Sequence, residues 1–419
     1  MVSSEERGST ARPCIYIKRL DPAIVNRTHE YPGLAKGTKI LVVGDGAVAA
    51  SARSLLKAAG CQVTALYKSA TAAATPGCLV VEGSPTSPDS CAKAVAGQEV
   101  VVHAGGPSCV AASWECVTSG TRNLVDIAAA AGVKGFVLAS SVSVVSGGKT
   151  SKTVSEDAPY PSRNDDPAAA ALAEAERLVL RANAVDGMLT CSVRSAPVYG
   201  PGESERLIPG LASRAKARVR AVGDGKNLVD FVYSGNVAHA LILAAQRLLS
   251  PAQQAAAAAA AAQTASAAGG RAYFVTDVEP VPYGEFTSRA LSRLGYPAPG
   301  SPGGSGAIPV ALALALAFLL RVVALVVSPI FEFRPALTAR RVSEESDVRR
   351  FDTSRAREEL GYAPRWAQEE ALDIALHSAL SLRNPRAELK HVGPFNAAEV
   401  ARHSTEDDAW IIVNGKVWR

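Results

Sequence analysis

The sequence has little that would suit a secreted, metal-binding or nucleic-acid-binding protein. Its seven cysteines are an odd number without the spacing of a disulfide framework, which fits a reducing compartment. Cysteine and histidine do not recur at metal-ligand spacing, so we expect no metal site. The net charge of +5 comes from scattered Lys and Arg, which argues against a nucleic-acid partner. The polar start, residues 3–7, is not typical of a secretory signal.

What the chain does have is length and apolar sequence. Its 419 residues are 48% hydrophobic and 20% charged, enough for a sizeable core in one large or two medium domains. Residues 1–36 show no clear periodicity, so we interpret them as an N-terminal tail ahead of the main domain, residues 37–383.

The stretch KILVVGDGAVAASARSLLKAAG, residues 39–60, organises that domain. An apolar run leads into the turn Gly44-Asp45-Gly46, and a helical run of small residues follows. Gly44 permits a sharp turn, Gly46 leaves room for a pyrophosphate at the helix N-terminus, and Ala49 takes the last place of G-x-G-x-x-G/A. Strand, glycine turn and helix in this order predict a dinucleotide-binding unit.

Strand and helix patterns then alternate. Strands are expected at 39–43, 62–67, 78–81, 99–104, 135–140 and 189–194, and helices at 48–59, 88–96, 113–131 and 168–184. Such alternation predicts an α/β fold, a Rossmann-type doubly wound parallel sheet. Beyond Tyr199 the pattern becomes irregular, which suggests a smaller C-terminal substrate-binding region.

Two later segments have unusual composition. Residues 253–270 are nearly all alanine and are interpreted as an exposed helical insert or a disordered loop. Residues 308–327 are apolar except for Arg321. Their length is enough to cross a bilayer, but a helix lying on the membrane, a buried helix and a hydrophobic lid all remain open.

Three segments carry a family resemblance. They are GTRNL at 120–124, RSAPVYGPG at 194–202, and GDGKNLVDFVY at 223–233 with NVAHA at 236–240. Across residues 38–383 the chain resembles the extended short-chain dehydrogenases, within them the 3β-hydroxysteroid dehydrogenase and sterol-4α-carboxylate 3-dehydrogenase (decarboxylating) family. The resemblance implies NAD or NADP as cofactor and a sterol or steroid as substrate. It also implies membrane association through residues 308–327, at the cytosolic face of the endoplasmic reticulum.

Within the third segment, Asp224-Gly225 predicts a hairpin-type turn. Asp230 is expected to cap a loop or helix, and His239 to make a structural hydrogen bond inside the substrate domain.

In this family a Ser, a Tyr and a Lys four residues after the Tyr carry the chemistry. Ser141 follows an apolar strand and fits the serine position. The motif containing the other two aligns with residues 166–176, where Ala168 takes the tyrosine position and Leu172 the lysine position. None of the ten tyrosines has a lysine four residues later. Tyr160, in a Pro-Tyr-Pro loop, is a weak candidate for the missing base.

The cofactor positions have also diverged. The acid that usually holds the ribose after the second strand is absent, and Lys68 follows that strand instead, where it either meets a 2′-phosphate or is simply solvated. Ala104 and Gly105 keep the small residues that let a dinucleotide lie over the sheet.

The final segment, residues 390–419, resembles the start of a cytochrome b5 domain. The histidines that hold the iron in that family lie beyond the resembling part, so haem is not expected. Two functions stay open: an NAD(P)-dependent 3β-hydroxysteroid dehydrogenase-type enzyme, or a non-catalytic paralogue that binds nucleotide or sterol.

Overall fold

A computed structural model describes most of the chain. The described residues are 31–67, 75–105, 114–145, 153–161, 167–202, 207–217, 219–260, 270–277, 279–298, 306–327 and 337–383, with short strands between 391 and 418. The predicted tail, residues 1–36, lies almost wholly outside them, as does Lys68.

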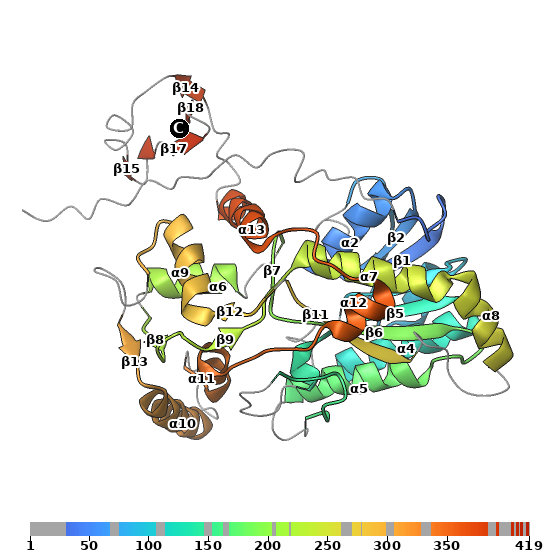
Figure 1. Cartoon of the computed structure of the whole chain (residues 1–419), viewed down its shortest axis with the longest axis horizontal. Helices are drawn as coiled ribbons and strands as arrows, with labels where there is room; N and C mark the ends of the chain where they lie inside the picture. Colours follow the sequence, from blue (N-terminus) through green and yellow to red (C-terminus); the bar gives the residue numbers. More distant parts are fainter. Residues whose placement is uncertain are drawn as a thin grey trace, which may run out of the picture.

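A seven-stranded parallel sheet forms the centre of the fold (Figure 1). Its order is β11-β6-β5-β4-β1-β2-β3. The bounds are β1 Lys39–Val43, β2 Gln62–Tyr67, β3 Leu79–Glu82, β4 Val100–His103, β5 Gly135–Ser141, β6 Leu189–Ser195 and β11 Arg271–Val275. Strands β1, β4 and β5 are mainly apolar, and β1 and β4 to β6 are buried along almost their whole length, as expected of a sheet covered on both faces. The six predicted strands and the doubly wound fold are confirmed.

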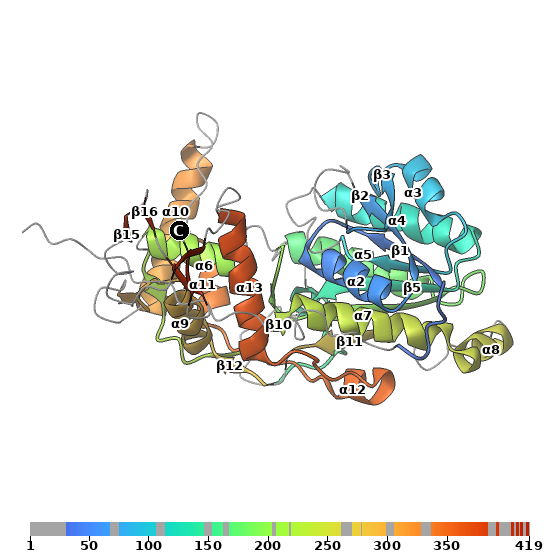
Figure 2. The ribbon, with the colours of Figure 1, turned by 90° about the horizontal axis from the view of Figure 1, so that it is seen from above.

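Helices cover both faces of the sheet (Figure 2). On one face α2 (Ala47–Ala58), α7 (Ser234–Leu249) and α12 (Ser354–Leu360) share a core with β1, β4 and β6. On the other face lie α3 (Pro88–Val95), α4 (Trp114–Ala130) and α5 (Pro167–Arg181). The sequence defines the start of α3. The Ser87 side chain accepts a hydrogen bond from the Ser90 amide, and Pro88 is the first helical residue.

The strand order reverses at β1. The chain leaves β1 through α2 to reach β2 on one side, and returns through α3 to β4 on the other. The carboxyl ends of β1 and β4, at Val43 and His103, therefore flank the point where a parallel sheet opens a crevice for ligands.

A second lobe lies beyond the carboxyl edge of the sheet (Figure 1). Its helices are α6 Ile208–Lys216, α9 Tyr283–Arg293, α10 Val310–Val327, α11 Ala339–Ser346 and α13 Gln368–Arg383. Its short strands are β7 Val198–Tyr199, β8 Ala221–Val222, β9 Leu228–Val229, β10 Val232–Tyr233, β12 Val281–Pro282 and β13 Ala307–Ile308. Aromatic packing forms its core, with the Phe231 and Phe286 rings stacked at 3.9 Å.

The prediction of a hairpin at Asp224-Gly225 is wrong. The flanking strands pair with other partners, β8 with β13 and β9 with β12, so the turn redirects the chain without folding it back on itself. Gly225 is needed there because its φ is +70° and a Cβ would lie 2.8 Å from the Gly284 Cα.

Helix α8 (Pro251–Ala260) forms the first part of the alanine-rich insert, and residues 261–269 lie outside the described part. Most of the predicted cytochrome b5-like segment also lies outside it. The described strands there are β14 His391–Gly393, β15 Ser404–Thr405, β16 Asp408–Ala409, β17 Ile411–Val413 and β18 Lys416–Trp418.

Helix α10, within the predicted hydrophobic segment, extends outward from the second lobe (Figure 2). Its small face packs on the lobe through Ala313 and Ala317. Most of its large side chains are exposed, Phe318 and Val326 each by 70%. Among the described residues, no helix meets the length and hydropathy required to cross a membrane.

Candidate active site

The glycine turn after β1 lies against the end of β4. Gly44 has φ +119°, and a Cβ there would come within 2.9 Å of the Gly105 backbone. The turn is fixed by hydrogen bonds from the Gly44 amide to the Leu66 carbonyl, 3.1 Å, and from the Ala104 amide to the Val43 carbonyl, 2.9 Å. The structure thus brings together Gly44, Ala104 and Gly105, three predicted cofactor residues, in backbone packing that tolerates no side chain at position 44.

The N-terminus of α2 has features of an anion site. Its N-cap is Gly46, which has no side chain to bond the first amides, and the first turn holds no acid. Ala49 is fully buried and brings the helix close to the sheet, whereas Asp45 is exposed in the turn. Because uncapped amides and the helix dipole attract negative charge, this end of α2 fits a pyrophosphate.

Arg53 is a residue that the sequence reasoning missed. Its side chain is fully buried; Nη1 donates to the Gly44 carbonyl at 2.7 Å and Nε to Thr75 Oγ1 at 3.1 Å. The guanidinium lies over the Tyr67 ring, 5.4 Å from its centroid, and burial lowers the pKa of Arg53. It places a cation beneath the glycine turn. The sequence feature that could have predicted this role is its position four residues after Ala49, which places Arg53 on the helix face that meets the sheet.

A pocket of about 410 Å³ joins the end of β5 to the second lobe. Its lining unites Ser141 with Ala168 and Leu172, the two positions where the family motif has its tyrosine and lysine. Apolar walls come from Val142, Ala169, Pro197, Val198, Leu207 and Phe231, and polar groups from Ser143, Arg214, Tyr283, Arg340, Glu344 and Arg349. A cavity lined about equally by apolar and polar groups suits a hydrophobic ligand that carries polar substituents.

Ser141 ends β5 beside Ser195 of β6. Its Oγ accepts a hydrogen bond from the Ser143 amide at 3.2 Å, which caps a short 3₁₀ turn, residues 142–144. A hydroxyl has one proton and two lone pairs, so this bond leaves the proton available for a ligand oxygen.

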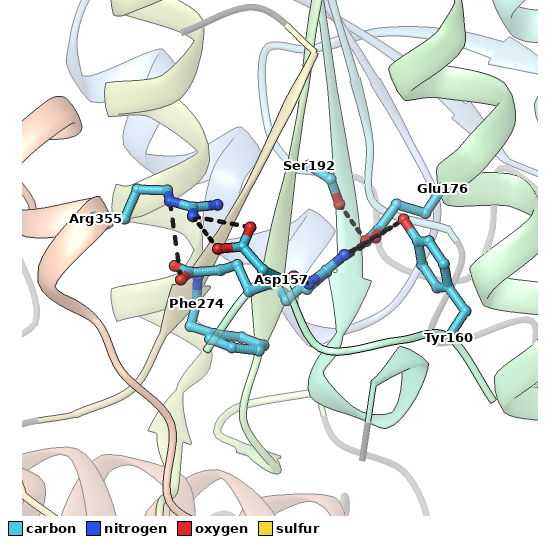
Figure 3. Close-up of polar contacts among 8 residues, drawn as sticks. Asp157, Tyr160, Glu176, Ser192, Phe274 and Arg355 are labelled. Carbon is cyan, nitrogen blue, oxygen red and sulfur yellow. Dashed lines mark hydrogen bonds and ion pairs between the residues drawn. The ribbon is translucent and has the colours of Figure 1, made fainter. Parts of the chain in front are cut away.

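Tyr160 belongs to a buried ion-pair network (Figure 3). Its hydroxyl donates to Glu176 Oε1 at 2.9 Å, and Arg194 Nη2 lies 2.6 Å from the same oxygen. Ser192 Oγ donates to Glu176 Oε2 at 2.7 Å. Burial, then Glu176, raises the pKa of Tyr160 to about 12, so this phenol is protonated at neutral pH and poorly suited to act as a base.

The same network continues to the far edge strand. Arg194 Nη1 donates to the Glu156 carbonyl at 2.7 Å, and the Glu156 carboxylate accepts from the Phe274 amide at 3.1 Å. Arg355 pairs with Asp157 at 3.1 Å, as the labelled side chains of Figure 3 show. The network therefore ties α5, β6 and β11 together.

Buried titratable groups outside the pocket have structural partners. His239 makes a structural hydrogen bond as predicted, with Nδ1 3.0 Å from Tyr31 Oη, but it lies on α7 over the nucleotide-binding sheet and not inside the substrate domain. Burial lowers the pKa of His239 to about 4. Asp230 makes a different bond from the predicted cap: its Oδ2 accepts from the amide of Phe351, which lies far along the chain in a bridge with Val154, at 2.8 Å. Asp277 accepts from Tyr199 Oη at 2.8 Å, and burial raises its pKa to about 6.

The strand order, the glycine turn and the open helix end define a dinucleotide-binding protein of the Rossmann type. The chain belongs to the 3-beta hydroxysteroid dehydrogenase/isomerase family, whose model matches residues 64–302. This confirms the resemblance read from the sequence motifs.

Relatives with assigned activities resemble the same region. An Arabidopsis thaliana protein described as 3beta-hydroxysteroid-dehydrogenase/decarboxylase isoform 1 is 34% identical over 70% of this chain and 64% of its own length. Isoform 2 is 34% identical over 74% of this chain and 53% of its own length. The Mus musculus sterol-4-alpha-carboxylate 3-dehydrogenase, decarboxylating, is 33% identical over 64% of this chain and 69% of its own length. The chain thus spans less than two thirds of the two plant relatives.

Solved structures share the fold. DesIV, a dTDP-glucose 4,6-dehydratase from Streptomyces venezuelae, superposes with a TM-score of 0.60 at 19% identity, covering 83% of this chain and 98% of its own. The Thermotoga maritima UDP-glucose 4-epimerase gives 0.58 at 17% identity, covering 83% and 100%.

Proposed function

We propose that this chain is an NAD(P)-dependent oxidoreductase of the 3β-hydroxysteroid dehydrogenase type that oxidises the 3β-hydroxyl of a sterol or steroid. The observation that carries the proposal is the pocket in which Ser141 meets positions 168 and 172. Family membership and the relatives' names support the substrate class.

Each part of the site has a role in this proposal. The coenzyme supplies the hydride acceptor. The α2 amides and the close-packed Gly44 and Gly105 hold its pyrophosphate, and the Ser141 hydroxyl binds and orients the substrate oxygen. Apolar walls around Leu172 and Phe231 exclude water from the steroid rings.

The proton route differs from that of the family motif. Neither Ala168 nor Leu172 can accept a proton, so the hydroxyl proton passes to water in the space that Ala168 leaves. Loss of a positioned general base lowers the rate by about 10²- to 10⁴-fold. The same two residues favour the second candidate function, a non-catalytic paralogue that binds nucleotide or sterol.

One experiment tests both candidates. The purified full chain in detergent is titrated with NAD and NADP, and its melting temperature is followed; a 3β-hydroxysterol is then added and reduced coenzyme is measured. The enzyme predicts a rise in melting temperature and slow coenzyme reduction above a protein-free control. A melting rise without reduction supports the binding protein, and no response to either coenzyme contradicts both nucleotide-dependent functions.

We further propose that α10 holds the protein on a membrane, at the cytosolic face of the endoplasmic reticulum as the family resemblance suggests. The support is its row of exposed apolar side chains, among them Leu312, Leu319 and Phe318. An apolar helix face that water solvates at a cost is stabilised in the interfacial layer of a bilayer.

A further inference from the structure

Arg53 lies where the glycine turn meets the end of β2. Side chains on a helix lean toward its N-terminus, so the Arg53 guanidinium reaches back along α2 to the turn. Its Nη1 donates to the Gly44 carbonyl at 2.7 Å, and its Nε donates to Thr75 Oγ1 at 3.1 Å. Its Cζ lies over the ring of Tyr67, the last residue of β2. The cation is therefore held at a defined place beside the turn that follows β1.

Two buried polar atoms at this place have no hydrogen-bond partner within the described residues. They are Arg53 Nη2 and Tyr67 Oη, on residues that are 0% and 5% exposed. The Arg53 contacts given above are all to neutral groups. The exposed Asp45 carboxylate also attracts the cation, but its effect on the Arg53 pKa is smaller than that of burial. A buried donor without an acceptor costs free energy, which a ligand with acceptor oxygens recovers.

The end of β2 lacks the acid that suits NAD. In dinucleotide-binding folds a carboxylate about 20 residues beyond the glycine turn bonds the ribose 2′-hydroxyl of NAD, whereas a nearby arginine accommodates the 2′-phosphate of NADP. Here no Asp or Glu stands between Asp45 and Glu82 in the sequence, and Tyr67 ends β2. The turn is accessible, because Asp45 is exposed and Gly44 and Gly46 are partly exposed. A phosphate at this edge of the sheet would therefore meet a cation and no carboxylate from β2.

We propose that Arg53, together with Tyr67, binds the 2′-phosphate of NADP, so that the chain takes NADP in preference to NAD. Arg53 Nη2 and the Tyr67 hydroxyl donate to phosphate oxygens, and charge-assisted bonds from a guanidinium to a phosphate are among the strong ones. The inference rests on the proposed nucleotide-dependent function and deepens it by naming the coenzyme that the turn selects.

The test measures binding and does not depend on turnover. The full chain is titrated in a calorimeter with NADP and NAD, and then with adenosine 2′,5′-bisphosphate and 5′-AMP. The members of each pair differ only in the 2′-phosphate. We expect the member that carries it to bind about tenfold or more tightly in both pairs.

Variants assign the preference to the two residues. Arg53→Gln brings both affinity ratios close to one. Tyr67→Phe removes only the hydroxyl and lowers the ratios in part. Arg181→Gln, which changes an exposed arginine at the end of α5, leaves them unchanged. Because each ratio is measured on one folded sample, a general loss of stability does not mimic the effect. Tyr67→Phe keeps the shape of the side chain and decides the question if Arg53→Gln does not fold.

The outcomes separate this inference from the proposed function. Equal binding of NADP and NAD by the parent chain overturns the 2′-phosphate site and leaves the dehydrogenase proposal intact. Weakening of both coenzymes by the same factor in Arg53→Gln also overturns it, because the residue then only supports the turn. Unchanged ratios in Tyr67→Phe remove the hydroxyl from the site. Failure of all four nucleotides to bind rejects the proposed function itself.

Discussion

Arg194 on β6 and Glu176 on α5 form a buried ion pair, with Nη2 and Oε1 2.6 Å apart and side chains 3% and 0% exposed. The pair fixes α5 against the sheet. Since α5 also carries Ala168 and Leu172, the pair sets where those two positions meet the pocket that contains Ser141.

Removing one partner of this pair should be strongly destabilising. Glu176→Ala leaves the Arg194 guanidinium buried without a counter-ion, and we expect a loss of about 3–5 kcal/mol in the free energy of unfolding. Denaturant titration measures it. Glu174→Ala breaks the more exposed pair with Arg177, 3.1 Å, and should cost less than about 1 kcal/mol. Equal losses in the two variants would contradict this account.

A methyl group at Gly44 should abolish coenzyme binding. In Gly44→Ala the Cβ would lie 2.9 Å from the Gly105 backbone, so the turn must open and the α2 amides shift. The matched control is Gly97→Ala, because Gly97 also has a positive φ, +69°, but nothing lies within 4 Å of its Cβ position. Both variants carry a backbone cost of roughly 1–3 kcal/mol. The measurement is the rise in melting temperature on adding NAD or NADP. If Gly44→Ala loses this rise and Gly97→Ala keeps it, the loss is due to the turn and not to the backbone cost.

Restoring the family motif should raise turnover. Ala168→Tyr with Leu172→Lys places a phenol and an ammonium in the pocket beside Ser141. If the coenzyme and sterol bind as proposed, coenzyme reduction should rise by about 10²- to 10⁴-fold. Leu172 is 5% exposed, so Leu172→Lys alone should lower the melting temperature without raising the rate. An unchanged rate in a folded double variant would favour the non-catalytic paralogue.

Stability should depend on pH through His239. Burial lowers its pKa from 6.5 to about 4. Between these two values the imidazole is protonated in the unfolded chain but remains neutral in the folded chain. The stabilising effect of the neutral imidazole is complete above pH 6.5 and is lost as the pH falls toward 4. His239→Gln removes this dependence and keeps an acceptor for Tyr31.

The measurement is the difference in unfolding free energy between the parent chain and His239→Gln, taken from pH 7 to pH 4. As the pH falls, the parent chain should become less stable relative to the variant by roughly 3 kcal/mol. The buried carboxyls of Asp230 and Asp277, whose pKa values burial raises to about 6, act in the opposite direction but cancel in the difference. Parallel curves would rule the explanation out.

Membrane contact should depend on the exposed face of α10. Leu316→Asp with Phe318→Asp and Leu319→Asp places three charges among apolar side chains that are 39–70% exposed, and flotation with phospholipid vesicles should be lost. The control is Leu79→Asp, an equally exposed apolar residue on the edge strand β3. Unchanged flotation of the triple variant would assign the contact elsewhere.

Local patterns were enough to predict the nucleotide-binding half. Each of the first six strands lies within two residues of its expected bounds, because apolar strands, glycine turns and helix caps act over short distances. The seventh strand, β11, was missed. It pairs with β6, about 80 residues earlier, and follows the alanine-rich insert, so no local alternation announces it.

The site was predictable only in part. Gly44, Gly105 and Ser141 stand at strand ends, where the fold class itself brings side chains together. Arg214 and Arg349 reach the pocket from helices and loops more than 70 residues beyond Ser141, and their approach depends on packing of the second lobe. The role of Tyr160 was equally hidden, since its partner Glu176 is chosen by the tertiary fold.

Helix α7 and strand β11 have a consequence for how the protein is made. Leu241, Leu248 and their neighbours on α7 are the cover over β1, β4 and β6, and β11 closes the edge of the same sheet. A fragment that stopped before residue 234 would carry every coenzyme-binding residue named above and still present a bare apolar face to water. The nucleotide-binding half is therefore not an independent folding unit. It can complete its fold only after much of the chain that follows it has been synthesised.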